Sequence, residues 1–183
     1  MKKVFLTVLA VALVAVTAVQ AQKVNKSALV SKIEKSDADI ADAKKGAKAA
    51  TWINRGKAFY EAAIEPTKNL FVNMDAAMLK LAVGEPASTE SVTLVNVPYE
   101  AWVYPWFTAY IKDGKIATWS QTQWVIEDAP AKAIEAYNKA YEMDPKTADK
   151  VKEGLKQISD FCSQVGNCLL YTSPSPRDRS VSR

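Results

Sequence analysis

Hydrophobic residues recur at helical spacing in the first third of the chain. An apolar stripe that follows Ser27 predicts a first helix with this serine as its N-cap, because a serine there accepts a backbone N–H of the first turn. A second stripe predicts a helix over 47–64, which ends before Pro66. A shorter apolar run predicts a helix over 76–83, closed by Gly84.

The middle of the chain changes to the alternating pattern of β-structure. Residues 91–97 predict a strand. Residues 101–124 predict a hairpin around Asp113-Gly114, since both positions of a two-residue turn need positive φ. The turn sets these cross-strand pairs: Ile111 with Ile116, and Thr108 with Trp119.

Helical spacing returns in the last third of the chain. Ala129 and Pro130 begin a helix that runs to about residue 143, because proline suits the first turn of a helix. Asp144-Pro145 ends this helix. A last helix is predicted over 148–165.

The predicted hairpin carries five aromatic residues on one face: Trp102, Tyr104, Trp106, Tyr110 and Trp119. An exposed patch of this size is typical of recognition, and it would suit sugar rings or an extended peptide. A two-stranded hairpin is marginal on its own, however, and must pack one face against something. Because aromatic side chains dominate buried packing energy, the core interpretation is favoured over the ligand platform.

Two motifs in the helices share a pattern of small and large residues. The later helix carries Ala133, Tyr137, Ala140 and, after its end, Pro145. The earlier helix carries Trp52, Gly56 and Phe59. Small residues in such a pattern let a partner helix cross closely, and the large ones fill the space between the helices. The later motif resembles the second helix of a tetratricopeptide repeat, and the earlier motif resembles its first helix.

This resemblance implies a fold class. The two motifs are separated by far more than the ~34 residues of one repeat, so we interpret them as one repeat that is split by the hairpin. We expect a mainly α fold of tetratricopeptide-like antiparallel helix pairs with an inserted β-hairpin, in which the segments around Trp52 and Tyr137 lie side by side. The body is similar to exported repeat proteins of Bacteroidetes-type bacteria. A further repeat would begin at Ala148 but lacks its second helix, so we expect a truncated array of repeats.

The two ends of the chain differ from the body. Residues 1–21 combine two lysines, an apolar run and small residues before Gln22, which is the pattern of a signal peptide cleaved after Ala21. Residues 168–183 back-translate into a string that resembles a sequencing adapter, so we interpret them as a non-native or disordered tail. The helical-repeat domain then covers 22–167, with the inserted β element at about 91–126.

Charge and composition exclude several function classes. The 183 residues carry a formal net charge of +4, which the two ends supply, so the body is neutral and lacks the basic patch that nucleic acid requires. With no histidine and only two cysteines, the chain cannot build a Ser–His catalytic site or an ordinary zinc site. We expect no cofactor, no metal and no membrane span after signal cleavage.

The resemblance also implies a function. Stacked repeats present a concave surface, so we expect an exported scaffold that binds a protein or peptide partner in the periplasm, the cell envelope or the extracellular space. The alternative is a glycan- or peptide-binding module that uses the aromatic face of the hairpin. A glycoside hydrolase with paired carboxylates such as Glu127-Asp128 ranks last, because adjacent acids at a helix start are usually caps. We therefore expect a protein that is not an enzyme.

Overall fold

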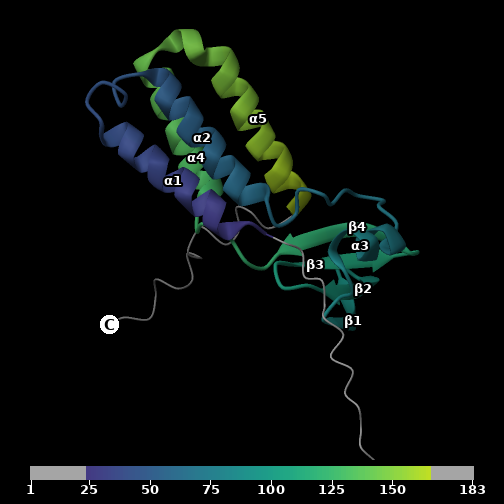
Figure 1. Ribbon diagram of the computed structural model, residues 1–183. Coiled ribbons are helices and arrows are strands. Elements are labelled where there is room, and N and C mark those ends of the chain that lie inside the picture. The colour runs from purple at the N-terminus through teal and green to yellow at the C-terminus, as the bar shows by residue number, and fades with distance from the viewer. Residues whose placement is uncertain (1–23, 166–183) are drawn as a thin grey trace, which may run out of the picture.

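The computed structural model describes residues 24–165, which form a bundle of helices joined to an antiparallel sheet (Figure 1). The bundle contains α1 (Lys26–Ala41), α2 (Ala49–Ile64), α4 (Ala129–Met143) and α5 (Ala148–Val165). The sheet contains β1 (Ser88–Leu94), β2 (Val97–Val103), β3 (Phe107–Lys112) and β4 (Lys115–Gln121). Helix α3 (Ala76–Val83) lies beside the sheet, and a 3-10 turn, η1 (Pro145–Thr147), joins α4 to α5.

The predicted helices are confirmed, with small shifts at their ends. Helix α1 is capped by Asn25 rather than Ser27, because the Asn25 side chain accepts the backbone N–H of Ala28 at 3.2 Å. Helix α2 begins at Ala49, two residues later than predicted, and α3, α4 and α5 have the predicted bounds.

The predicted fold class is wrong. Helices hold 54% of the described residues and strands hold 20%, so the fold is a mixed α/β fold and not a mainly α fold of tetratricopeptide-like helix pairs. The difference arises over 88–121, where the chain forms two hairpins rather than one, so the β element begins before 91 and ends before 126. The additional turn is Val95-Asn96, with φ of 49° and 62°. Positive φ is unusual for a β-branched residue, so the sequence gives little warning of this turn.

The sheet has the strand order β1-β2-β3-β4, and each neighbouring pair is antiparallel. Ile111 pairs with Ile116, as predicted. Thr108 pairs with Ser120 rather than Trp119, because the register shifts at Tyr110/Ile111. An extra residue in one strand moves every later pair by one position.

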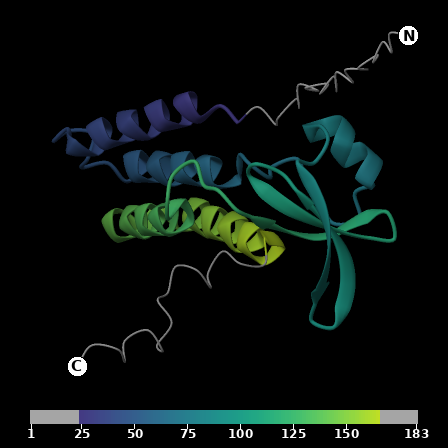
Figure 2. The same ribbon diagram turned by 90° about the horizontal axis from the view of Figure 1, so that it is seen from below.

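Helices α2 and α4 pack side by side although the whole sheet lies between them in the chain (Figures 1 and 2). The Gly56 backbone of α2 lies against the Tyr137 ring of α4, and Lys132 Nζ lies 6.0 Å from the centre of the Phe59 ring. The expected proximity of the Trp52 and Tyr137 segments is therefore confirmed. The buried core continues from this helix pair into the sheet, and Trp124, in the loop between β4 and α4, makes an edge contact with Phe161 of α5 at 6.3 Å.

Two of the sequence predictions lie outside the described residues: the signal peptide over 1–21 and the tail over 168–183. Within 24–165, no helix combines the length and the apolar character needed to cross a membrane.

Candidate functional site

The structure separates the five aromatic residues that the sequence places on one face. Three of them are buried in the core, with exposed fractions of 8% for Trp102, 4% for Tyr104 and 2% for Trp119. Trp102 and Trp119 both pair with Ala109 and so share its sheet face. Tyr110 follows Ala109 along β3 and therefore lies on the opposite face, half-buried, and Trp106 is also half-buried.

A tight turn at Pro105 explains why the predicted aromatic face does not form. The Tyr104 N–H donates to the Phe107 carbonyl at 2.9 Å, so the chain reverses between β2 and β3. The sequence prediction treats the residues before and after Pro105 as one continuous strand of the 101–124 hairpin. Reversal of the chain changes which alternate residues face the core, so residues before and after the turn no longer follow one count.

The residues of the two helix motifs are brought together. Gly56, Phe59, Ala133, Tyr137 and Ala140 are all buried. Trp52 is half-buried, and its indole N–H donates to the Gly46 carbonyl at 2.9 Å. Pro145 is exposed at the start of η1. Six of these seven positions are therefore buried or half-buried in the helix bundle, and Pro145 is not.

Tyr137 occupies the centre of the bundle. Its side chain is 1% exposed and lies between two glycines, Gly56 of α2 and Gly154 of α5. A methyl group on Gly56 would lie 2.8 Å from Cε1 of the Tyr137 ring, and a methyl group on Gly154 would overlap the ring more severely. The two glycines therefore create the space that the tyrosine fills.

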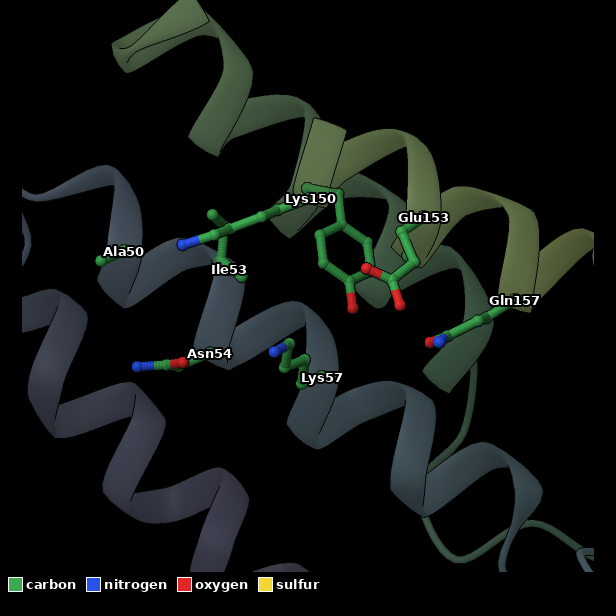
Figure 3. Close-up of a pocket in the computed structure, with 9 residues that line it drawn as sticks. Ala50, Ile53, Asn54, Lys57, Lys150, Glu153 and Gln157 are labelled. Carbon is green, nitrogen blue, oxygen red and sulfur yellow. The ribbon is translucent and has the colours of Figure 1, made fainter. Parts of the chain in front are cut away.

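A groove runs along the outer side of Tyr137, between α2 and α5 (Figure 3). Its volume is about 280 Å³. Helix α2 supplies Ala50, Ile53, Asn54 and Lys57, and α5 supplies Lys150, Glu153, Gly154 and Gln157. In Figure 3 the side chains of Lys150, Glu153 and Gln157 extend from α5 toward the gap, whereas that of Asn54 extends from α2 away from α5. We call this the α2–α5 groove.

A wider hollow of about 620 Å³ adjoins the groove at the first turn of α2. Three residues line both spaces: Ala50, Ile53 and Lys150. The hollow is closed on its far side by Met143, Asp144, Lys146 and Thr147, at the junction of α4 and α5. Both spaces are open to solvent, and we refer to these two adjoining spaces along α2 together as the channel.

The channel is electropositive. Its lining contains four lysines and two acids: Lys48, Lys57, Lys146 and Lys150, with Asp144 and Glu153. None of these lysines forms an ion pair with another residue of 24–165. Helix α2 also begins here without a side-chain cap and without an acid in its first turn, so its positive end adds to the field.

The Tyr137 hydroxyl contributes a neutral donor to the groove. Burial raises the pKa of Tyr137 above its usual value, and Tyr60 and Glu153 add to the rise. The phenol therefore stays protonated at physiological pH. Tyr137 is one of the residues that line the groove, although its side chain is only 1% exposed.

The sequence analysis did not identify the residues of this channel. Asn54 and Lys57 on α2, and Lys150, Glu153 and Gln157 on α5, are ordinary polar positions on amphipathic helices. One signal was present, because Gly154 interrupts a strongly amphipathic helix. Glycine in a helix interior costs about 1 kcal/mol relative to alanine and usually marks a close approach.

Among residues 24–165, no group of three or more His, Cys, Asp or Glu side chains is arranged to hold a metal ion. Glu127 and Asp128 precede α4, where Asp128 adopts a left-handed φ of 55° and makes no capping hydrogen bond. Comparison of the chain with protein-family models, curated proteins and solved structures found no match. The resemblance to exported tetratricopeptide proteins stays a prediction.

Proposed function

We propose that this protein is a non-enzymatic interaction protein that binds an extended, acidic polypeptide segment in the channel along α2. Because residues 1–21 have the pattern of a signal peptide, the proposal places this binding after export, in the cell envelope or beyond it. The observation that carries the proposal is the electropositive groove between α2 and α5, with the hydroxyl of Tyr137 at its base.

The lining of the channel suits a peptide. Ala50, Ile53 and Met143 provide apolar surface for side chains, and Gln157 provides a side-chain amide on the α5 wall. A side-chain amide both donates and accepts, so it can pair with the N–H and the C=O of an extended backbone. A narrow channel with apolar surface and a few polar groups is the usual form of such a site.

The charge of the channel selects an acidic segment. The lining holds four lysines and only two acids, and those lysines form no ion pair within 24–165. An anionic ligand would therefore be attracted to the lysines without breaking an existing ion pair. The body as a whole is neutral, which disfavours a nucleic acid as the ligand because phosphate binding needs a broad basic surface.

The two other functions considered from the sequence have less support. The aromatic residues Trp102, Tyr104 and Trp119 are buried in the core, so they are not available to a sugar ring in this structure. The proposed acid pair, Glu127-Asp128, lies outside the channel. We therefore retain neither the glycan platform nor the hydrolase.

Reversing the charge of one channel lysine is expected to weaken peptide binding. The probe is a pool of fluorescein-labelled decapeptides with alternating acidic and apolar residues, and binding is measured by fluorescence anisotropy. Lys150→Glu should raise the dissociation constant at least tenfold, roughly 1.4 kcal/mol, because it places a carboxylate beside Glu153 in the wall of the groove. Added salt should weaken binding to the unmodified protein.

Lys152→Glu is the matched control. Lys152 lies two residues away on α5, is exposed, and does not line the channel, so the variant has the same net charge with the groove intact. Binding should change less than twofold. Equal losses for Lys150→Glu and Lys152→Glu, or equal binding of a pool with lysine in place of the acids, would contradict the proposal.

A further inference from the structure

The two edge strands of the sheet, β1 and β4, differ in whether other segments bond to their outer sides. At β4, the segment that precedes α3 covers the start of the strand: the Asn73 N–H donates to the Ile116 carbonyl at 2.8 Å, and the Ile116 N–H donates to the Met74 carbonyl at 2.8 Å. At β1, no backbone group within residues 24–165 bonds to the outer side of the strand. One edge is therefore covered at its start, whereas the other is open within residues 24–165.

Strand β1 lacks most of the features that usually protect an open edge. Native edges are blunted by charged side chains, above all lysine, by proline, by a bulge or by a covering segment, and of these β1 has one charge, Glu90. Strand β1 has the sequence Ser-Thr-Glu-Ser-Val-Thr-Leu, pairs with β2 without a register shift, and is exposed along most of its length. Its hairpin with β2 extends away from the helices, and no other element of residues 24–165 lies in front of it (Figure 2).

The turn determines which residues point to the open side. Leu94 and Val97 flank the two-residue turn and are cross-strand partners, and in a two-residue hairpin this closing pair is of the hydrogen-bonded kind. Antiparallel pairs alternate between hydrogen-bonded and non-hydrogen-bonded, so every second residue from Leu94 bonds to β2. The N–H and C=O groups of Thr89, Ser91 and Thr93 then point outward.

We propose that β1 pairs with β1 of a second copy of this chain, antiparallel about a two-fold axis at Ser91, to join the two sheets into one. In this register Ser91 is opposite Ser91 of the partner subunit, and Thr89 is opposite Thr93 of the partner subunit. All three outward-pointing residues therefore exchange both backbone hydrogen bonds, whereas a register shifted by one residue leaves some of these groups without partners.

The side chains of β1 are compatible with pairing to themselves. The face that carries Thr89, Ser91 and Thr93 would bring hydroxyl groups opposite hydroxyl groups, a favourable cross-strand combination. The only charged residue of the strand, Glu90, would be opposite Val92 of the partner subunit, so no two like charges stand opposite each other. This self-complementarity favours a second copy over an unrelated extended segment. The proposal is independent of peptide binding in the channel, which lies on the helices.

The register is tested by disulfide formation in the full chain. In a background with Cys162 and Cys168 replaced by serine, Ser91→Cys should form a covalent dimer under mild oxidation, because paired residues across the axis have Cα atoms about 5.5 Å apart, within disulfide range. Val92→Cys is the matched control. Its symmetry mate lies diagonally across the axis, so crosslinking should be at least tenfold slower. Equal crosslinking of the two variants would overturn the register.

The pairing itself is tested by the mass of the full chain in sedimentation equilibrium from micromolar to millimolar concentration. The protein should approach twice its monomer mass, and Ser91→Pro should weaken the dimer at least tenfold, because each copy loses one outward N–H. Ser91→Thr, which keeps the N–H, should dimerise normally. Circular dichroism should show an unchanged fold in both variants, since Ser91 N–H does not bond to β2. A monomer at all concentrations, or a dimer indifferent to Ser91→Pro, would overturn the proposal.

Discussion

Replacing Tyr137 with alanine should destabilise the protein by about 3–5 kcal/mol, because a fully buried aromatic side chain at the meeting point of three helices would leave a cavity. The loss should appear as a lower midpoint in urea unfolding followed by circular dichroism. Tyr141→Ala, one turn further along α4, is the matched control. Tyr141 is 48% exposed, so its removal should change stability by about 0.5 kcal/mol or less.

The same packing predicts a coupled effect at Gly154. Gly154→Ala alone should cost about 1–3 kcal/mol, because the added methyl group overlaps the Tyr137 ring. In the Tyr137→Ala background the overlap disappears, and Gly154→Ala should stabilise the helix by up to about 1 kcal/mol through its better helix propensity. The two substitutions should therefore be non-additive in a double-mutant cycle. Additive effects would show that Gly154 is not present to accommodate Tyr137.

Replacing Gln121 with leucine should destabilise the protein by about 2–4 kcal/mol, because two buried polar groups would lose their partner. Gln121 is 9% exposed and ends β4. Its amide N–H donates to the Ala63 carbonyl at 3.2 Å, and its amide oxygen accepts from the Thr67 hydroxyl at 3.2 Å. Pro66 has no N–H, and the Thr67 N–H donates to Ile64, so the last turn of α2 depends on this side chain.

Gln123→Leu is the control for this prediction. Gln123 lies two residues further on, and its side chain is exposed, so the substitution should change stability by about 0.5 kcal/mol or less. Thr67→Val provides a second test. In the Gln121→Leu background the threonine hydroxyl is already unsatisfied, so Thr67→Val should recover part of the lost stability. A Gln121→Leu variant as stable as the unmodified protein would show that the amide does not connect the sheet to the bundle.

The two hairpin turns of the sheet differ in how well the sequence predicts them. Asp113-Gly114 identified the β3–β4 turn because only a few residue types tolerate positive φ at both turn positions. The same rule missed Val95-Asn96, where a valine adopts a φ of 49°. The pairing of the strands on either side offsets the energy of that backbone conformation, and this pairing cannot be recognised from the few residues around the turn. One missed turn changed the fold class.

The channel was missed for a different reason. Lys57 and Lys150 lie far apart in the chain, and each is an ordinary polar position on its own helix. They face one channel only because α2 and α5 pack on opposite sides of Tyr137. The prediction of an aromatic face was wrong for a related reason. The turn at Pro105 changes the face on which Trp102 lies relative to Tyr110 of β3.

The local sequence determined the extents of the helices and the Asp113-Gly114 turn. These features depend on neighbouring residues: apolar periodicity, capping groups and residues that tolerate positive φ. The contact between the Trp52 and Tyr137 segments is long-range, and it was predicted from the resemblance of their two motifs to one helix pair. Tertiary structure alone decided the mixed fold, the burial of Trp102 and Trp119, the lysines that share the channel and the open edge of β1. Each of these features depends on which surfaces meet in space. A local pattern specifies which face of a helix or strand is apolar, but not which other element covers that face.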